Sequence, residues 1–288
     1  MSDVPRYLDA CPVGCQSSLI PTDIALPEGC LLRCDRCGQL VSQCPEAGYW
    51  ASMAEFDDPQ GTLPSAASAK RRFANERKRL EQIARFLDQP KHEIRLLDVG
   101  CSSGAFLGVA KTLGFERAEG VEPAPKAAQS ALASGLKVYQ GTLQEVQFAA
   151  HSFDAVTLFE VIEHLKDPIS LLHECHRVIR PGGVMMIGTG NADSWTVAVM
   201  KGRWEYFHVA KHGGHVSFFR PASIRLLAQR TGFAVEKVST RNVRFYEKGD
   251  LPRPAYQAAK AVSELANIPA RRAGKGHDML VCLRRLGQ

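Results

Sequence analysis

Short apolar runs and amphipathic stretches alternate along the central part of the chain. Ile94, Leu96, Leu97 and Val99 form a run rich in branched side chains, and small polar residues and glycines follow it. A helical apolar pattern then begins, so the order is strand, tight loop and helix. A strand that is apolar at nearly every position is typical of a parallel sheet covered on both faces. The pattern therefore predicts an α/β fold.

The same alternation continues to the end of the chain and predicts six more strands. They are a run that ends at Glu122 and the ranges 136–140, 153–159, 184–189, 234–239 and 279–283. We expect the last strand to be the antiparallel hairpin partner of the strand before it. A Pro-Gly-Gly turn at 181–183 precedes the strand at 184–189.

Helical and irregular segments surround this predicted sheet. Residues 69–87 carry an apolar stripe at helical spacing and follow a linker at 57–68 that is rich in Pro, Gly and Ser. Residues 191–220 are an insertion rich in aromatic residues and histidine, which is typical of a substrate lid at the edge of a sheet. Residues 251–272 predict another helix, with prolines near its ends.

Composition limits the class of protein. With 288 residues and 45% hydrophobic residues, the chain can form one large α/β domain and a small extra module. It has no run of about 18 apolar residues that would span a membrane. The first ten residues have no apolar signal segment, so we expect a cytoplasmic protein.

The net charge of +6 lies at the C-terminal end. From Arg241 onward there are ten Lys and Arg against four Asp and Glu, which accounts for the whole excess. A basic tail suits an acidic substrate, nucleic acid or a membrane surface, and it is also typical of a solvated basic face.

Six of the nine cysteines lie before Pro45, and four of them have the spacing of metal ligands. Cys11 and Cys15 form C-x3-C, an eighteen-residue spacer follows, and Cys34 and Cys37 form C-x2-C. In a chain without a signal segment, such clustered cysteines favour structural Zn²⁺ over disulfides. A redox C-x2-C lacks its βαβ context here, and four thiolates leave no open position for catalytic zinc. Cys30 and Cys44 are left over as alternative ligands or buried thiols.

The loop after the first predicted strand has the residues of a nucleoside site. Gly100 and Gly104 let the backbone turn and approach a ligand, but the spacing GCSSG fits neither a full dinucleotide fingerprint nor a P-loop. Glu122, at the tip of the second strand, can accept hydrogen bonds from both ribose hydroxyls. The combination predicts an adenosine ligand without a pyrophosphate.

At this point the chain resembles the class I S-adenosylmethionine-dependent methyltransferases. LLDVGCSSGAFL and GVEP are similar to the first two motifs of that family, and the segments at 141–168 and 173–191 match its adenine-side loop and central strands. The resemblance covers roughly 94–235 and implies S-adenosyl-L-methionine as cofactor. It implies these cofactor-binding residues: Asp98, Gly100, Cys101, Ser102, Gly104, Glu122, Pro123, Thr142, Leu143, Phe159 and Glu160. Thr142 stands where the family usually carries Asp, so its hydroxyl, or the neighbouring backbone, would have to serve instead.

Histidines are the candidate general bases. Glu160 and His164 are four residues apart, so they would share one face if their segment is helical. His208, His212 and His215 lie in the predicted lid. An imidazole suits a hydroxyl acceptor, because its ordinary pKa is near neutral. Each of these histidines could instead make a structural hydrogen bond.

Together these observations predict a Rossmann-like seven-stranded methyltransferase sheet with an N-terminal zinc-binding module and a lid insertion. We place the zinc knuckle at 1–48, the linker and helix at 49–92 and the methyltransferase domain at 93–288, with the lid at about 190–220. The resemblance extends to sugar and other small-molecule methyltransferases, so we expect O-methylation of a small molecule or glycan, with the acceptor on a carrier or free. The rivals are an RNA methyltransferase that docks through the zinc module and basic tail, and a non-catalytic binding protein. The acceptor and the oligomeric state stay open.

Overall fold

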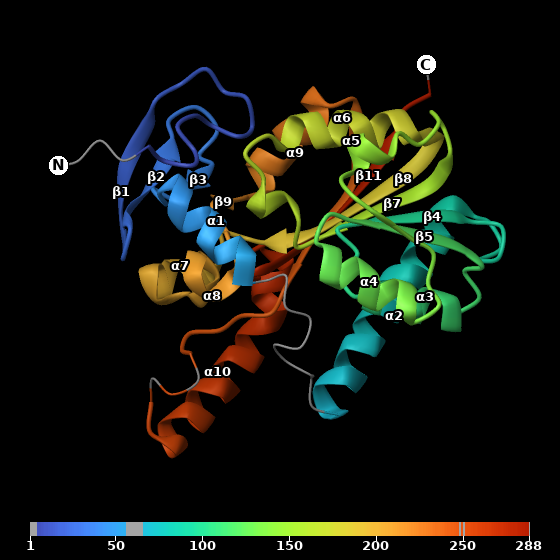
Figure 1. The fold of residues 1–288 in the computed structure, drawn as a ribbon. Helices are drawn as coiled ribbons and strands as arrows, with labels where there is room; N and C mark the ends of the chain where they lie inside the picture. Colours follow the sequence, from blue (N-terminus) through green and yellow to red (C-terminus); the bar gives the residue numbers. More distant parts are fainter. Residues whose placement is uncertain (1–4, 56–65, 248, 250, 288) are drawn as a thin grey trace.

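The computed structural model describes residues 5–55, 66–247, 249 and 251–287. A seven-stranded sheet with helices on both faces forms the larger part of these residues, and a four-stranded sheet lies beside it (Figure 1). Most of the predicted linker, residues 57–65, falls outside the described residues.

The seven-stranded sheet has the order β10-β11-β8-β7-β4-β5-β6. Its strands are β4 (Arg95–Val99), β5 (Arg117–Glu122), β6 (Val138–Gln140), β7 (Phe153–Phe159), β8 (Ile179–Gly190), β10 (Phe233–Arg241) and β11 (Asp278–Arg285). Neighbours from β8 to β6 pair in parallel, whereas β11 is antiparallel to both β8 and β10. The predicted seven-stranded α/β sheet and its terminal antiparallel hairpin are therefore confirmed.

Helices cover both faces of this sheet (Figure 1). One face carries α2 (Ala66–Leu87), α3 (Ala105–Thr112) and α4 (Pro125–Ala133), and the other carries α5 (Leu143–Val146), α6 (Pro168–Val178) and α9 (Pro221–Arg230). The apolar stripe of α2 is buried through Leu80 and Ile83, which join one core cluster with strand residues. Side chains of α6 and α9 form the main core on the opposite face. Burial on both faces explains why the central strands are apolar at nearly every position.

The fifth predicted strand is longer than its apolar run. β8 begins at Ile179, five residues before the predicted start, because Ile179 pairs with Phe153 before the register shifts. The segment with Pro181 and the two glycines that follow it is therefore an irregularity inside the strand, not a turn that precedes it.

The first residues of the chain form a separate sheet that the predicted lid completes. The order is β1-β2-β3-β9, with β1 (Leu19–Leu26), β2 (Gly29–Cys34), β3 (Leu40–Val41) and β9 (Ser217–Phe218). β3 pairs with β9 antiparallel, so residues of the predicted 1–48 module and of the predicted lid share one hydrogen-bonded sheet. The rest of the insertion forms the helix α7 (Trp195–Met200). Three short helical turns follow it: η2 (Lys201–Arg203), η3 (Glu205–Phe207) and α8 (Val209–His212). The helix α1 (Glu46–Glu55) packs against α8.

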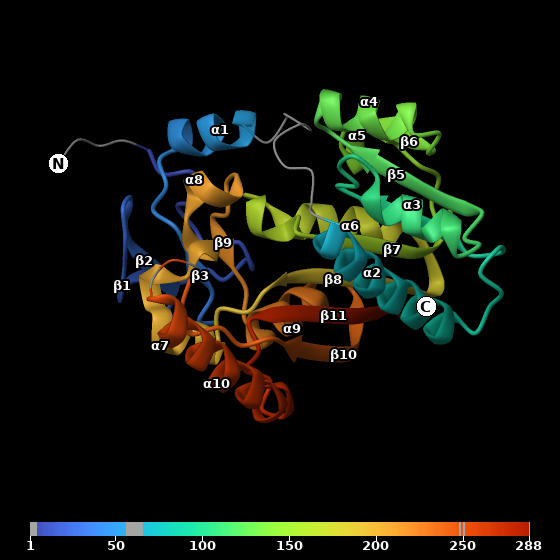
Figure 2. The same ribbon diagram turned by 90° about the horizontal axis from the view of Figure 1, so that it is seen from below.

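A long helix, α10 (Arg253–Arg272), lies between the last two strands of the chain. It extends away from the sheet, near the N-terminal end of α2 in Figure 1, and Figure 2 shows it beside α7 and β10. None of the helices formed by the described residues combines the length and the apolar character that crossing a bilayer requires.

Candidate functional site

The bend after β4 brings bare backbone to the carboxyl edge of the sheet. Gly100 has φ +72°, and a Cβ on it would lie 2.6 Å from Val161 Cγ2. Gly104 has φ +81° at the start of α3, and a Cβ there would overlap the Leu136 side chain. Ser102, between them, also has a positive φ of +49°. Only glycine adopts such a conformation without strain, and the side chains of Val161 and Leu136 occupy the space that a larger residue would need at these two glycines.

Glu122 ties this bend to the neighbouring strand. Its Oε2 accepts a hydrogen bond from the Ser102 N–H at 2.8 Å, and its Oε1 accepts one from the Ala124 N–H at 2.8 Å. The side chain is only 7% exposed. Because β4 and β5 are parallel neighbours, the bend and this carboxylate meet at the carboxyl edge of the sheet, next to the point between β4 and β7 where the strand order reverses, which is the usual ligand position in such sheets.

Asp98 and Cys101 lie beneath the bend. The Thr157 hydroxyl donates to Asp98 Oδ1 at 2.6 Å, and burial raises the pKa of Asp98 to about 7. Burial also raises the pKa of the Cys101 thiol. The floor of the site is therefore dry, which strengthens any electrostatic interaction made there.

The adenine-side loop uses its hydroxyl for helix capping. The Thr142 N–H donates to the Glu145 carboxylate at 2.7 Å, and Thr142 Oγ1 accepts from the Glu145 N–H at 3.3 Å. This capping box begins α5, with Leu143 buried behind it and Pro123 exposed on the other side. The Thr142 hydroxyl is therefore already engaged within the chain.

α2 contributes two charged residues that sequence reasoning missed. The Arg79 guanidinium lies 4.2 Å from the centre of the Phe159 ring, and it pairs with Glu76 Oε2 at 2.9 Å. Both charged side chains are mostly buried, at 18% and 13% exposed. The signal that could have found them is their position: they lie one and four residues before buried Leu80, on the inward side of an otherwise basic helix.

Two carboxyl groups lie close together after β7. Glu160 has φ +55°, so the chain breaks there and a short 3-10 helix, η1 (Ile162–His164), begins two residues later. The conditional prediction that Glu160 and His164 share a helical face therefore fails. Burial, and next the charge and hydrogen bond of neighbouring Glu163, raise the pKa of Glu160 well above its ordinary value. Glu160 therefore binds a proton more tightly than a free carboxyl group does.

Hydrogen bonds from β8 and the lid hold Glu163. The Tyr206 hydroxyl donates to Glu163 Oε1 at 2.5 Å, and the Thr189 hydroxyl donates to Oε2 at 3.1 Å. The Tyr206 hydroxyl also accepts from the Gly190 N–H at 2.8 Å. Glu163 is fully buried. The lid residue Tyr206 therefore connects the end of β8 to the cleft, a role that the sequence did not reveal.

The structure brings His164 and His215 together, with ring centres 4.7 Å apart. His215 Nδ1 lies 3.0 Å from the Tyr206 carbonyl, which can only accept, so Nδ1 carries the proton and Nε2 faces Glu163 Oε1 at 3.9 Å. His164 Nδ1 is buried and has no hydrogen-bond partner within the described part of the chain. Ligand atoms of Glu163, His164 and His215 all lie within 4.8 Å of one another.

The other two candidate bases do not join this group as far as the structure describes them. His208 Nε2 lies 2.8 Å from the Gly202 carbonyl, which is a local hydrogen bond within the lid. The side chain of His212 lies outside the described residues.

The four cysteines with metal-ligand spacing converge. The sulfurs of Cys11, Cys15, Cys34 and Cys37 lie within 4.8 Å of one another, and those of Cys11 and Cys37 are 3.5 Å apart. A hydrogen bond from Cys37 lowers the pKa of Cys11 to about 5, which favours a thiolate. Tetrahedral zinc with bonds of about 2.3 Å requires sulfurs about 3.8 Å apart, so the four residues fit that ion. Cys30 and Cys44 contact Gln43 and Pro45 instead.

The cysteine cluster is fastened to the larger sheet. The Arg230 guanidinium, at the end of α9, donates to the Val13 carbonyl and lies 3.7 Å from Cys15 Sγ. Gly14 and Gly38 close the two knuckle turns with positive φ, and their N–H groups donate to the carbonyls of Cys11 and Cys34 at 2.9 Å. These cysteines belong to the same core as α6 and α9.

Known proteins share this architecture. A family model described as "Methyltransferase domain" matches residues 69–238, more than half of the chain. Ubiquinone biosynthesis O-methyltransferase of Klebsiella pneumoniae is 34% identical over 143 residues, which cover 45% of this chain and 57% of that protein. The protein with the same description from Cereibacter sphaeroides is 35% identical over 138 residues, or 43% and 56% of the two chains. The chain thus matches little more than half the length of these curated relatives.

A solved structure supports the fold. Geranyl diphosphate C-methyltransferase from Streptomyces coelicolor aligns with 83% of this chain and 98% of its own, with a TM-score of 0.53 and 16% identity. The family match, the strand order and the glycine bend beside Glu122 agree with one another. The chain therefore belongs to the methyltransferase-domain family and has the fold of the class I S-adenosylmethionine-dependent methyltransferases.

Proposed function

We propose that this protein transfers a methyl group from S-adenosyl-L-methionine to a hydroxyl of a small molecule or glycan. The observation that carries the proposal is Glu122, a buried carboxylate whose two oxygens are already aligned by backbone N–H groups beside the glycine bend. A carboxylate in that place can bind both hydroxyls of a ribose. The curated relatives are named O-methyltransferases, which supports an oxygen acceptor.

Methyl transfer from a sulfonium needs alignment more than acid catalysis. The positive charge on sulfur disperses as the bond to carbon breaks, so holding acceptor, methyl carbon and sulfur in line can supply much of the rate. Asp98, held by the Thr157 hydroxyl, and Arg79, which lies over the Phe159 ring, would orient the cofactor. The acceptor approaches from the side of Glu160 and the lid.

His164 is the base we propose for a hydroxyl acceptor. It is half-buried at the end of η1, and its buried Nδ1 has no partner among the described residues, which marks a nitrogen that a ligand can complete. His215, Glu163 and Tyr206 would act as positioning residues, because each is fixed by hydrogen bonds that lead back to the sheet. His208 and His212 remain predictions without such support.

The cluster around His164 could instead bind a metal ion. Glu163, His164 and His215 offer one oxygen and two nitrogen ligands within 4.8 Å, which a divalent cation could use. Assays with chelator-treated protein, with and without added Mg²⁺ or Zn²⁺, separate the two readings. Activity that survives chelation favours His164 as base, and activity that returns only with the cation favours the metal.

Structural zinc in the N-terminal module is part of the proposal. Four convergent sulfurs, two knuckle turns with positive φ and burial in the main core support it. Bound zinc would hold the first sheet together and, through the pairing of β3 with β9, the lid that carries Tyr206 and His215.

The test is calorimetric binding of S-adenosylhomocysteine to the Glu122→Ala variant. Each lost bond to a charged acceptor is worth about 1.5–3 kcal/mol, so affinity should fall at least about 100-fold. The matched control is Glu119→Ala, which removes the same charge from the same strand where Glu119 pairs with surface Lys137. Unchanged affinity in Glu122→Ala, with native folding, would refute the cofactor site and favour a non-catalytic binding protein. Salt-dependent RNA binding by the wild type would favour the RNA methyltransferase reading.

A further inference from the structure

A polar cavity lies between α2, α10 and the end of the sheet that β10 and β11 form. Its volume is about 560 Å³, and it is enclosed by α2, the segment that follows β10, the start of β11 and α10. Its lining includes the side chains of Arg71, Asn75, Arg241, Arg244, Lys260 and Asn267. These elements meet at the carboxyl edge of the sheet, where ligands bind in such folds.

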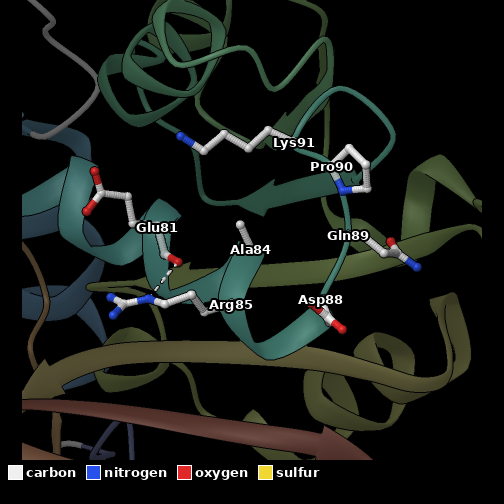
Figure 3. Close-up of a pocket in the computed structure, with 7 residues that line it drawn as sticks. All are labelled: Glu81, Ala84, Arg85, Asp88, Gln89, Pro90 and Lys91. Carbon is white, nitrogen blue, oxygen red and sulfur yellow. Dashed lines mark hydrogen bonds between the residues drawn. The ribbon is translucent and has the colours of Figure 1, made fainter.

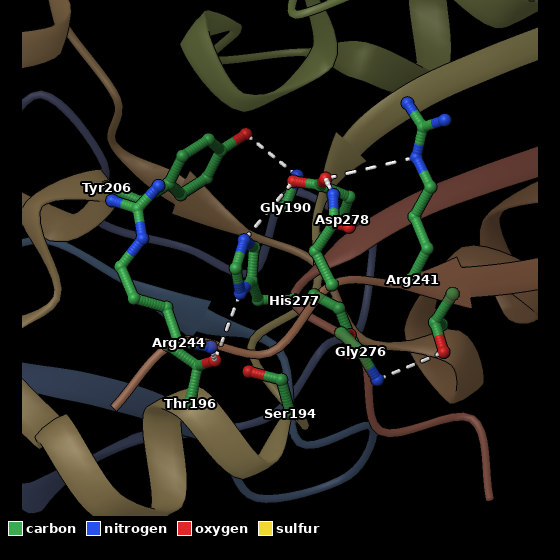
Figure 4. Close-up of polar contacts among 12 residues, drawn as sticks. Gly190, Ser194, Thr196, Tyr206, Arg241, Arg244, Gly276, His277 and Asp278 are labelled. Carbon is green, nitrogen blue, oxygen red and sulfur yellow. Dashed lines mark hydrogen bonds and ion pairs between the residues drawn. The ribbon is translucent and has the colours of Figure 1, made fainter. Parts of the chain in front are cut away.

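Two hydrogen-bonded steps connect this cavity to Glu163. Asp278, in the cavity wall, is the strand partner of Gly190. The Gly190 N–H donates to the Tyr206 hydroxyl, which in turn donates to Glu163. Figure 4 shows Tyr206, Gly190 and Asp278 side by side, with Arg241 and Arg244 on either side. α2 also spans both places, because Arg79 faces the cleft and Asn75, one turn earlier, faces the cavity.

The lining is predominantly basic. Arg71, Arg241, Arg244 and Lys260 face two lining carboxylates, Glu264 and Asp278. Arg241 pairs with Asp278 at 3.9 Å and donates to Asn75 Oδ1 at 3.3 Å, which fixes its guanidinium in the wall. Arg244 pairs with Glu247 at 2.8 Å from outside the lining. Lys260 pairs with Glu264 at 3.8 Å, so with Glu247 included four cations meet three carboxylates and the excess is one positive charge.

Neutral groups complete a binding surface. Asn267 Oδ1 is buried and has no hydrogen-bond partner within the described chain. Its amide can turn over, so it can offer either an oxygen or an N–H to a ligand. The half-buried rings of Tyr246 and Tyr256 add flat surfaces of the kind that ligand pockets use for ring systems.

We propose that this cavity binds a phosphate or diphosphate group of the methyl acceptor, so that the substrate class is an anionic, carrier-linked molecule. The inference rests on the proposed methyl transfer and assigns its acceptor subsite. Planar guanidinium groups and an ammonium group are the side chains that recognise phosphate oxygens. The phosphate would lie among Arg71, Arg241 and Lys260, and the rest of the acceptor would extend past Asp278 toward His164.

The test is calorimetric titration of the full chain with inorganic pyrophosphate at low ionic strength. The double variant Arg71→Gln/Lys260→Gln removes two exposed cations from the lining, and we expect at least about tenfold weaker binding, since each bond to a charged group is worth about 1.5–3 kcal/mol.

The control is Arg85→Gln/Lys91→Gln, which removes the same charge. These two residues line a different cavity, of about 680 Å³, at the C-terminal end of α2, where Figure 3 shows them with Glu81, Ala84, Asp88, Gln89 and Pro90. Binding in this control should equal that of the wild type. Equal weakening in both variants, or no pyrophosphate binding by the wild type, would overturn the proposal.

S-adenosylhomocysteine binding in the same samples separates this proposal from the proposed function. If S-adenosylhomocysteine binds and pyrophosphate does not, the acceptor subsite fails and the methyltransferase site stands. If pyrophosphate binds and S-adenosylhomocysteine does not, the phosphate site stands and the methyltransferase site fails. Uridine diphosphate and farnesyl diphosphate then distinguish the carrier: tighter binding of the first indicates a nucleotide, and tighter binding of the second indicates a lipid.

A second observation concerns the outer face of α10. Val262, Leu265 and Ile268 are spaced three apart and are 54%, 78% and 65% exposed, whereas the inward face carries buried Ala259 and Ser263. The large apolar side chains of this helix thus point away from the body of the protein. Such a stripe on one helix face marks an interaction surface.

Charge indicates what covers this stripe. α10 carries Arg253, Lys260, Arg271 and Arg272 against Glu264. The nearby start of α2 adds exposed Lys70, Arg71 and Arg72. Packing two copies of such a helix together would place like charges side by side, whereas an anionic bilayer complements them. We infer that α10 lies on the surface of an anionic membrane, with its apolar stripe in the headgroup region.

Co-sedimentation of the full chain with lipid vesicles tests this inference. We expect binding to phosphatidylglycerol-containing vesicles and not to pure phosphatidylcholine, with at least about fivefold weaker binding of the Leu265→Ser/Ile268→Ser variant, which loses buried apolar area. The control Leu132→Ser/Leu286→Ser changes two exposed leucines elsewhere and should bind as the wild type does. Vesicle binding that is equal in all variants, or a dimer in solution that the Leu265 variant abolishes, would overturn the inference.

Discussion

The cofactor side and the acceptor side of the cleft are built in different ways. On the cofactor side, the glycine bend and Glu122 come from one strand-loop-helix-strand unit, and the key bond joins residues twenty apart. On the acceptor side, the lid depends on residues far away in the chain: the Gln39 side-chain amide donates to Ser217 Oγ at 2.9 Å, and the Tyr49 hydroxyl donates to the His164 carbonyl at 2.9 Å. Cofactor binding is therefore a local property, whereas acceptor geometry depends on the N-terminal module.

Removing the zinc ligands should have the largest effect, and it should affect the acceptor side far more than the cofactor side. In Cys34→Ser/Cys37→Ser we expect loss of about one zinc per chain and of methyl transfer, because structural zinc supplies roughly 10 kcal/mol or more of folding free energy in small modules. S-adenosylhomocysteine affinity should change far less. Metal analysis and calorimetry on the same samples measure both effects. Cys30→Ser/Cys44→Ser, outside the cluster, is the control, and a metal-free wild type with an ordered N-terminal sheet would contradict the zinc assignment.

Asp98 gives a pH test on the cofactor side. Its pKa is raised from 3.8 to about 7 by burial, so the folded state binds the proton more tightly than the unfolded state. The stabilisation is present below about pH 4 and is lost as the pH rises to about 7, a difference of about 4 kcal/mol. Asp98→Asn should lack this step in chemical denaturation curves between these pH values. Parallel curves for the two proteins would show that Asp98 titrates normally.

Tyr206→Phe tests the link between lid and cleft. Loss of the hydrogen bond to Glu163 should lower kcat about 10- to 100-fold, with little change in cofactor affinity, because a bond to a charged group is worth about 1.5–3 kcal/mol. The pH profile of kcat should shift as well, because the Tyr206 hydroxyl bonds Glu163, whose charge helps to raise the pKa of Glu160. Tyr139→Phe, a ring on β6 that packs against Phe148, is the control. A change confined to KM would argue against a positioning role.

Thr142→Ala should have the smallest effect. The capping box begins α5, so its loss should lower the free energy of unfolding by about 1 kcal/mol. Cofactor affinity should change less than about threefold, because a hydroxyl committed to capping contributes little to the adenine site. Thermal denaturation and calorimetry measure the two quantities, and Thr112→Ala, whose hydroxyl bonds the Gly108 carbonyl in a surface helix, is the control. A large loss of affinity would give Thr142 the adenine role instead.

The features that the sequence predicted correctly are local ones, and those that it missed depend on contacts between distant segments. Periodicity predicted the seven strands and the terminal hairpin, because each central strand is buried on both faces and shows it residue by residue. Cysteine spacing predicted which sulfurs would converge. Arg79, Glu163 and Tyr206 were missed as site residues, since no local pattern distinguishes a charge that faces a cleft from one that faces solvent.

The sequence by itself determined the sheet, the glycine bend with Glu122, and the cysteine quartet, because each of these depends on short-range spacing and on backbone conformations that few residues allow. Only the tertiary structure decided that β9 completes the N-terminal sheet, that His164 and His215 meet while His208 does not, and that Arg71 and Lys260 face one cavity. These arrangements depend on packing between segments far apart in the chain, and the hydrophobic pattern of each segment is compatible with many such packings.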